Sequence, residues 1–167
     1  MRTNVPYTAF QRRLVVARAL EVVEARLRDE TSFEAGGQVF TFEVGAGTSV
    51  RFVRQVFESA LGLPAKSWPY SGATAKDLMA QLRAAGEEVD PEELRPGDIL
   101  CHGEFLFGHA GLYVGRRRHS RDGRTFVAEN TAWVGGDPID PGTKLTPLKA
   151  FLSRAKAWRA FRLFPTE

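Results

Sequence analysis

Apolar residues recur at helical spacing in three segments of the chain, which cover residues 10–27, 48–61 and about 75–85. Side chains three or four positions apart fall on one face of a helix, so each segment is predicted to form an amphipathic helix. Gly62 and Pro64 are expected to end the second helix and Gly86 the third, because glycine is favoured just past a helix C-terminus and proline cannot continue the helix.

The second half of the chain changes to short extended patterns separated by turn residues. Four segments are predicted to be strands, at residues 98–101, 110–114, 125–128 and 157–163. Asp122-Gly123 favours a hairpin turn between the second and the third of them, and an earlier β excursion or hairpin is expected over residues 33–44. A short helix is expected to begin at Thr146-Pro147, since proline is favoured in the first position of a helix. Helices followed by a mostly antiparallel sheet indicate an α+β fold.

Length and composition fit one soluble domain. The chain has 167 residues, of which 43% are hydrophobic and 26% are charged, and a chain of this kind can bury a core of ordinary size. Residues 1–31 are expected to form an N-terminal helical extension and residues 45–164 the core of the fold. The formal net charge of +3 is compatible with an acidic polymer as a partner but is too small to indicate nucleic acid binding.

The chain has a single cysteine, Cys101, which excludes an internal disulfide and a zinc site made of several cysteines. Cys101 is expected to be buried in the core, and His102 and His119 are expected to lie on the surface. A metal site formed by His102, His109 and Glu104 would match no established ligand spacing, so neither a metal nor another cofactor is expected.

The sequence contains no segment typical of a membrane anchor or an export signal. No apolar run approaches the roughly 18–20 residues that a membrane span needs. The apolar residues 14–17 near the N-terminus are too few for a signal peptide and have charged residues on both sides. The sequence therefore predicts a cytoplasmic protein without membrane contact, and any action outside the cell would need another route of release.

Three positions have the residue types of a nucleophilic site. Ser49 follows a glycine-rich segment at the start of a predicted helix, where the helix dipole favours an anion; it or Thr48 could equally serve as an N-cap. His109 opens a predicted strand between glycines, and an imidazole titrates near neutral pH, which suits a general base. Glu129 and Asn130 end the next strand, where either could orient the imidazole. Successive side chains of a strand point to opposite faces, so only one of the two is expected to face His109.

Three longer segments agree in order and spacing with one known family. Residues 49–57 read Ser-Val-Arg-Phe-Val-Arg-Gln-Val-Phe, residues 94–100 read Leu-Arg-Pro-Gly-Asp-Ile-Leu, and residues 108–115 read Gly-His-Ala-Gly-Leu-Tyr-Val-Gly. They resemble, in turn, the nucleophile helix, the start of the first core strand and the histidine strand of the papain-like cell-wall hydrolases of the NlpC and CHAP types. The resemblance covers roughly residues 45–133, and it implies a papain-like fold with N-terminal helices packed on a mostly antiparallel sheet.

The resemblance implies a role for each matched position. Ser49 stands where the family has its nucleophilic cysteine, and His109 stands at the position of the general base. Glu129 best matches the third catalytic residue, with Asn130 as the neighbouring alternative, and a CHAP-like site would use both. The resemblance also implies a peptidoglycan peptide or muropeptide as the substrate. No nucleic acid or membrane partner is expected, and the chain is expected to be a monomer. The tip of the helix that begins at Ser49 is expected to face the His109 ring across a cleft.

The serine at position 49 is the main departure from the family. Papain-type sites stabilise a thiolate beside an imidazolium, whereas a serine hydroxyl must lose its proton during the attack, so little or no hydrolysis is expected. Three explanations stay open: an engineered inactive variant, a natural domain that binds wall peptide without cutting it, or a working serine hydrolase. A structural role, for example in a phage particle, is a further alternative.

Trp68, Tyr70 and Trp133 flank the proposed site along the chain. Aromatic side chains of this kind can form the walls of a substrate groove. They can equally anchor loops against the core, and both interpretations stay open.

Overall fold

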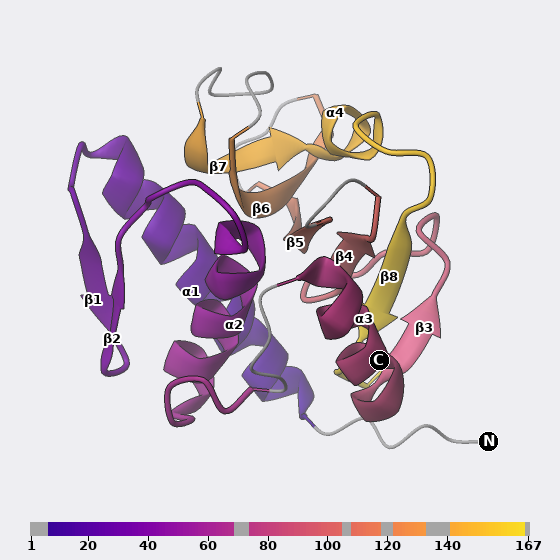
Figure 1. Ribbon diagram of the computed structural model, residues 1–167, viewed down its shortest axis with the longest axis horizontal. Helices are drawn as coiled ribbons and strands as arrows, with labels where there is room; N and C mark the ends of the chain where they lie inside the picture. The colour runs from indigo at the N-terminus through magenta and orange to yellow at the C-terminus, as the bar shows by residue number, and fades with distance from the viewer. Residues whose placement is uncertain (1–6, 69–73, 105–107, 118–121, 133–140, 166–167) are drawn as a thin grey trace.

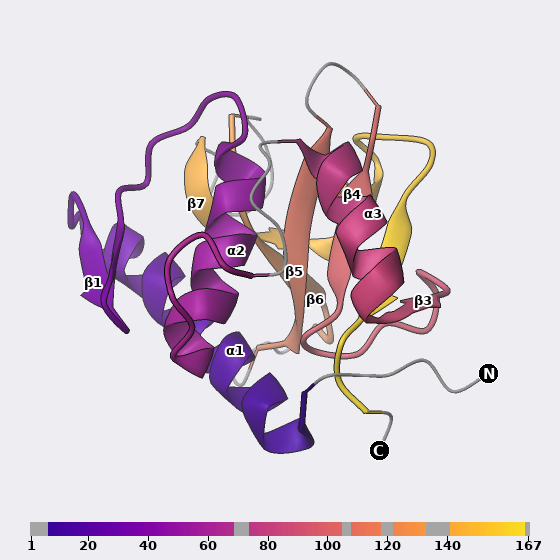
Figure 2. The same ribbon diagram turned by 60° about the horizontal axis from the view of Figure 1, so that its bottom comes forward.

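The structure is a computed structural model, and it describes residues 7–68, 74–104, 108–117, 122–132 and 141–165. Along the chain its elements are α1 (Ala9–Leu27), β1 (Phe33–Ala35), β2 (Gln38–Phe40), α2 (Thr48–Leu61), α3 (Ala75–Ala85), β3 (Glu87–Val89), β4 (Ile99–His102), β5 (His109–Arg116), β6 (Thr125–Thr131), β7 (Gly142–Pro147), α4 (Leu148–Leu152) and β8 (Arg159–Arg162). The strands β1 and β2 form a separate hairpin at one side of the molecule (Figure 1, Figure 2). The other six form one antiparallel sheet in the order β3-β8-β4-β5-β6-β7. The fold is therefore α+β.

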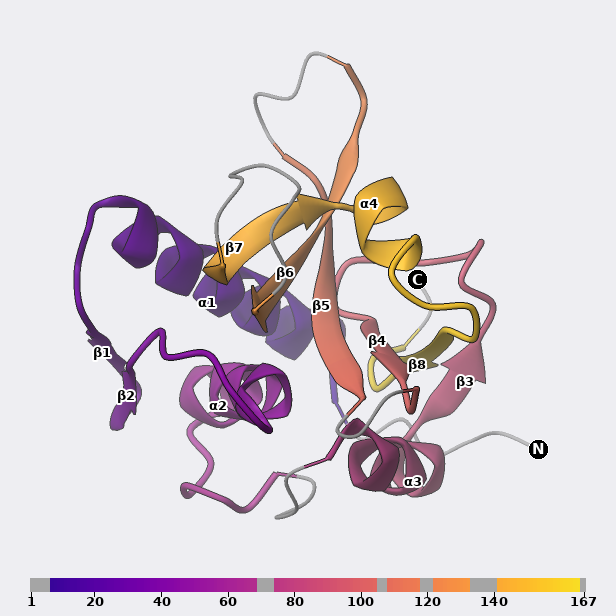
Figure 3. The ribbon, with the colours of Figure 1, turned by 45° about the horizontal axis from the view of Figure 1, so that its top comes forward.

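The central sheet has helices on both of its faces, with α2 and α3 on one side and α4 on the other (Figure 3). Strand alternation divides the core accordingly. Ile99 and Leu112 belong to the larger apolar cluster, which includes residues of α1, α2 and α3. Leu100 and Tyr113 pack with Phe151 of α4 in the smaller cluster. Among the described helices, none combines the length and the apolarity that a membrane crossing requires.

The helix α1 is part of the main core. Val15, Ala19 and Val22 are fully buried and belong to the same cluster as the apolar face of α2. The helix α1 was predicted to belong to an N-terminal extension. Its buried residues instead contribute directly to the core that packs on the sheet.

A glycine in β5 determines how closely α4 approaches the sheet. A Cβ atom at Gly111 would lie 2.9 Å from the ring of Phe151 and 2.6 Å from Cγ1 of Val127. Contacts this short would force α4 away from the sheet, because a packed core cannot absorb an extra methyl group without movement. Gly111 therefore allows the segment after α4 to come close to β6.

Asp98 joins three strands at the start of β4. Its two carboxylate oxygens accept hydrogen bonds from Nε and NH2 of Arg162, at 2.9 and 2.7 Å, and from the N–H of Arg95 at 2.8 Å. Two backbone hydrogen bonds extend the pairing of β4 and β5 to this segment: the N–H of Gly97 donates to the carbonyl of Tyr113, and the N–H of Tyr113 donates to the carbonyl of Asp98. Gly97 has a φ of +101°, which glycine adopts without strain. The Pro-Gly-Asp segment therefore holds the sheet together.

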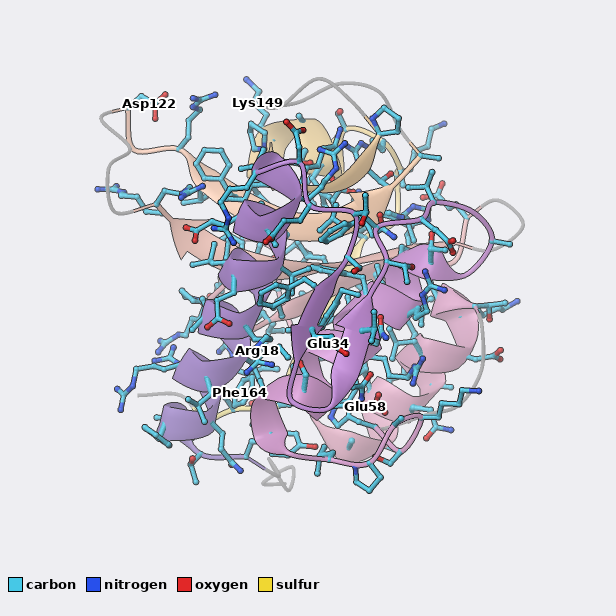
Figure 4. The ribbon with its side chains drawn as sticks, turned by 90° about the vertical axis from the view of Figure 1, so that its left-hand side faces the viewer. Arg18, Glu34, Glu58, Asp122, Lys149 and Phe164 are labelled. Atoms are coloured by element: carbon cyan, nitrogen blue, oxygen red, sulfur yellow. The ribbon has the colours of Figure 1, made fainter. Side chains whose placement is uncertain are left out.

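The β1–β2 hairpin packs across α2, as the side view shows (Figure 4). Its turn residue Gly36 has a φ of +55°, and a Cβ atom there would collide with the carbonyl oxygen of Ser59. Glu58 is fully buried and accepts hydrogen bonds from Nε2 of Gln38 at 2.9 Å and from NH1 of Arg54 at 3.1 Å. These contacts fix the hairpin on the body of α2.

Two strands of the sheet were not predicted. The strand β3 has only three residues, too few for an alternating pattern to be recognised. The strand β7 contains Thr143, Lys144 and Thr146, which are polar and yet buried. They are buried because β7 pairs with the polar end of β6, where Asn130 lies opposite Thr143 and Glu129 lies opposite Lys144.

The fourth helix begins later than predicted. Thr146 and Pro147 complete β7, and α4 starts at Leu148. Proline is tolerated in the last position of an edge strand, because its missing N–H is not needed there. The same residue that favours a helix start therefore also fits the end of this strand.

Candidate active site

The first turn of α2 carries Ser49 and has no side-chain cap. The N-cap is Gly47, with a φ of 75°, and no side chain of the described residues bonds to the first helical N–H groups. Thr48 instead closes the preceding loop, since its hydroxyl donates to the carbonyl of Gly45 at 2.9 Å and accepts from the Gly45 N–H at 3.0 Å. Neither Ser49 nor Thr48 is the N-cap, and the positive end of the helix dipole can act on the Ser49 side chain.

His109 begins β5 and is hydrogen-bonded to Glu129 of the neighbouring β6. Its Nε2 atom lies 2.7 Å from Oε1 of Glu129, and the two side chains are 9% and 0% exposed. An ionised carboxylate only accepts hydrogen bonds, so Nε2 carries the ring proton and Nδ1 keeps its lone pair. Within the described part of the chain, Nδ1 makes no hydrogen bond. The hydrogen bond therefore fixes the orientation of the ring, and Nδ1 is the atom through which its neutral form can accept a proton.

The carboxylate of Glu129 stays ionised although it is buried. Its Oε1 also accepts a hydrogen bond from NH1 of Arg154 at 2.6 Å. Burial raises the pKa of Glu129, but the hydrogen bond and charge of His109 and the charge of Arg154 together lower it by more, so the pKa lies below its usual value. Arg154 follows α4, in a context that does not differ from that of a surface arginine, and its role could not be found from the sequence.

Asn130 lies next to Glu129 on β6 and points to the opposite face of the sheet. Its Nδ2 donates to the carbonyl of Glu43 at 2.7 Å, and Oγ1 of Thr143 donates to its Oδ1 at 3.4 Å. Glu43 belongs to the segment that leads into α2. Of the two alternatives for the third residue, Glu129 therefore contacts His109, whereas Asn130 fixes the segment that carries the start of α2.

Ser49 and His109 are brought to the same end of the sheet. The N-terminal turn of α2 and the first residues of β5 lie side by side in Figure 2 and Figure 3. Ala110 and Val50 belong to the same apolar cluster, which fills the core between α2 and the sheet. The preceding residue, His109, turns to the other face, where its ring centroid lies 5.7 Å from that of Phe151. No hydrogen bond joins Ser49 to His109 among the described residues. The structure thus contains the expected pair of imidazole and carboxylate. The expected facing of the α2 N-terminus and the His109 ring is not among the described contacts, because the ring contacts Phe151 of α4 on one face of the sheet and α2 covers the other face.

Trp68 anchors a loop and does not line a groove. Its side chain is 2% exposed, and its ring stacks on Phe57 of α2 at a centroid distance of 4.0 Å. Its backbone N–H donates to Oε2 of the buried Glu58 at 3.0 Å. Of the two interpretations of Trp68, the structure therefore supports the anchoring of a loop and not the wall of a substrate groove. Tyr70 and Trp133 lie outside the described residues.

His102 is buried, contrary to the expectation of a surface residue. It is 3% exposed, its ring meets Trp158 edge-on at 4.5 Å, and its Nδ1 accepts from the N–H of Glu104 at 3.1 Å. It pairs with His109 across β4 and β5, with ring centroids 6.2 Å apart. Alternation along β4 turns it to the face where Trp158 covers it. Cys101, the residue before it, is fully buried, as expected.

The buried His102 is expected to make the protein less stable as the pH falls below about 6.5. Burial lowers the pKa of His102, and the charge of His109 lowers it further, outweighing the effect of Glu104. The unfolded chain therefore takes up the proton first, so the free energy of unfolding decreases as the pH falls from the unfolded pKa through the folded one. Urea denaturation of the wild type and of His102→Asn at about pH 8 and about pH 5 measures the effect. The variant should lose less stability on acidification, and an equal loss in both proteins would contradict the prediction.

Comparison with known proteins does not place the chain in a family. No protein-family model matches the sequence, and no curated protein matches it at a significant level. Within the described residues, no group of three or more histidine, cysteine, aspartate or glutamate side chains is arranged to hold a metal ion. The function must therefore be inferred from the arrangement of Ser49, His109 and Glu129.

Proposed function

We propose that the chain is a papain-like domain of the NlpC and CHAP type, which binds peptidoglycan peptides at the site around His109 and does not cleave them while serine occupies position 49. The observation that supports this most is the buried hydrogen bond between Nε2 of His109 and Glu129. A carboxylate that holds an imidazole in one tautomer is the arrangement that base catalysis of acyl transfer uses. The order α2, α3, β4, β5 and β6 along the chain also agrees with the order of segments in that family.

The same arrangement supplies two parts of a hydrolytic mechanism. Nδ1 of His109 keeps a lone pair that can take the proton of a nucleophile, and Glu129 stabilises the imidazolium that then forms. The N–H groups in the first turn of α2 have no side-chain cap among the described residues, and such groups stabilise the negative charge that develops on a carbonyl oxygen during attack. The part that is missing is a nucleophile that ionises readily.

Serine at position 49 does not supply that part. A cysteine thiol at such a helix terminus loses its proton before the attack, whereas a serine hydroxyl needs a base that is already in hydrogen-bond contact with it. Ser49 makes no such contact with His109 within the described residues. We therefore expect the site to hold a wall peptide without hydrolysing it.

Wall binding without release of products is the expected behaviour of the chain. Purified sacculi should sediment the protein, soluble muropeptides should compete, and no new soluble fragments should form. The matched control is wall material from which the peptides have been removed; it should retain only the weak, salt-sensitive binding that follows from the net charge of +3. Equal binding to both materials at moderate salt would overturn the proposal, and so would the release of fragments by the wild type.

A further inference from the structure

A groove lies along the first half of α1, at the end of the sheet far from His109. It has a volume of about 360 Å³, and its lining consists of Arg12, Arg13, Val16, Ala17, Leu20 and Pro96. Pro96 precedes β4 and lies against Gly115, near the last residue of β5, whereas His109 is the first residue of that strand. Figure 2 shows α1 beside this end of β5. The groove is therefore separate from the candidate active site.

Two glycines make room for the walls of this groove. Gly115 has a φ of +79°, and a Cβ atom there would lie 2.9 Å from Cγ of Pro96. Gly97 has a φ of +101°, and a Cβ atom there would lie 2.8 Å from Cγ of Arg12. Contacts this short would displace the proline ring and the stem of the arginine. The walls are thus fixed by the packing of the sheet, and the groove forms without a partner.

The exposed side of α1 next to the groove is apolar and basic. Phe10 and Leu14 are 61% and 38% exposed, and Ala17, one turn further on, is also exposed. Steps of four and three residues place them in one stripe along the helix. Residues 9–20 include arginines but no aspartate or glutamate. Arg13 is exposed and has no acidic partner within the described residues, and its guanidinium lies 6.0 Å from the centre of the Phe10 ring. Apolar surface beside charge of one sign is typical of an interaction site.

The charges along α1 favour an acidic partner over a second copy of this chain. After Ala17 the exposed stripe continues with Glu21 and Glu24. Two copies that paired through the apolar half of α1 would bring Arg13 close to Arg13 of the other copy, which is unfavourable. Two copies that paired along the whole stripe in antiparallel directions would place Glu24 against Phe10, and burying an unpaired charge is costly. A partner with carboxylates beside its apolar residues meets neither obstacle.

We propose that this groove is a docking site for an acidic amphipathic helix of a partner protein. Apolar side chains three and four positions apart on that helix enter the groove and cover Phe10 and Leu14. Its carboxylates lie against Arg13, where the opposite charge fixes the orientation of the helix. A recess suits side chains that project from a helix better than it suits the flat surface of a membrane. The inference is independent of the proposed function, because the groove and His109 lie at opposite ends of β5.

Peptide binding to the native full-length chain tests the inference. The probe is a synthetic peptide of about 20 residues, long enough to form a helix, with leucines in one stripe and glutamates elsewhere. The comparison peptide has lysines in place of the glutamates. The glutamate peptide should shift the amide NMR signals of residues 12–20 and of Gly97, and leave that of His109 unchanged. It should bind about ten times more tightly than the lysine peptide at low salt. Equal binding of the two peptides, or shifts that leave out residues 12–20, would overturn the inference.

Arg13→Glu separates docking in the groove from attraction to the net charge. This variant should weaken binding of the glutamate peptide about tenfold, because it places a like charge beside the carboxylates. Arg83→Glu is the matched control. Arg83 is an exposed arginine of α3 that lies 5.9 Å from the centre of the Phe161 ring, much as Arg13 lies by Phe10. It reverses the same charge at another helix and should change the affinity less than about twofold. Similar losses in both variants contradict the proposal.

Ala17→Glu tests the apolar part of the same surface. Ala17 is exposed and lines the groove, so the substitution leaves the core intact and puts a carboxylate where the apolar side chains enter. It should also weaken binding of the glutamate peptide about tenfold or more, and unchanged binding would overturn the inference. Two further results would do so. Binding to vesicles of phosphatidylserine and phosphatidylcholine without binding of the peptide would assign the surface to a membrane. A dimer in light scattering that Ala17→Glu dissociates would assign it to a second copy.

Discussion

A Ser49→Cys variant is expected to carry a thiol that reacts with iodoacetamide at neutral pH about ten times faster than free cysteine. Position 49 is 8% exposed, in contrast to the fully buried Cys101, and it lies in the first turn of α2, whose N-terminal N–H groups have no side-chain cap among the described residues. A helix dipole at such a position stabilises a thiolate and lowers the pKa of a cysteine from about 8.5 into the range of roughly 3.5–7.5. Mass spectrometry of the alkylated peptide over a pH series gives both the rate and the pH at which the thiolate forms.

Cys101 is the internal control for this experiment. It is fully buried, and burial raises the pKa of its thiol well above the usual value. The folded wild type should therefore show almost no alkylation and should become labelled only when it is denatured. Position 49 would be wrongly assigned if the thiol of Ser49→Cys reacted no faster than free cysteine in a folded protein.

The same variant is expected to release soluble fragments from purified sacculi, whereas the wild type and Ser49→Ala release none. The thiolate would attack the peptide carbonyl, and the imidazolium of His109 would give its proton to the leaving amine. Adding His109→Gln to Ser49→Cys should reduce the rate about 100-fold or more, because it removes the acid and base together. A reactive thiol in a variant that stays inert on sacculi would mean that the substrate class is wrong and the nucleophile position is right.

The base–carboxylate pair could be predicted from the sequence as far as a choice of two residues. Period-two alternation places Glu129 and Asn130 on opposite faces of β6, so one of them had to face the neighbouring strand's histidine. Which one does so depends on the register between β5 and β6. That register shifts between Tyr113 and Gly115, where an irregularity interrupts the ladder. Counting residues from the turn could not reveal this shift, and so the choice needed the structure.

Features that depend on contacts between distant segments could not be predicted. Arg154 reaches Glu129 across 25 positions of the chain, and Gly111 leaves the space in which the nearby Phe151 of α4 packs on the sheet. Trp68 is buried because Phe57 provides a face for stacking. Polar residues of β7 are buried because they meet polar residues of β6, as Lys144 meets Glu129. In each case the partner decides the environment of the residue, and local patterns contain no information about the partner.

Replacing Asp98 by alanine is expected to lower the free energy of unfolding by about 3–5 kcal/mol. The carboxylate is 1% exposed and accepts two hydrogen bonds from Arg162 and one from the backbone of Arg95. The hydrogen bond with Asp98 raises the pKa of Arg162, so the guanidinium stays charged in the folded protein. Without Asp98, a largely buried positive charge loses its partner and the N–H of Arg95 loses its acceptor, which is far more costly than the loss of a surface pair.

Glu88→Ala is the matched control for this prediction, because Glu88 pairs with Arg159 on the surface. It should cost less than about 1 kcal/mol, and urea denaturation followed by tryptophan fluorescence compares the two variants directly. Similar losses in both would show that burial adds nothing to the Asp98 pair. If the large difference is found, the role of the Pro-Gly-Asp segment is to join β4 to β8, and the segment needs no catalytic role to explain it. A chain can then keep this segment while position 49 changes, because the segment stabilises the sheet whereas position 49 lies on α2.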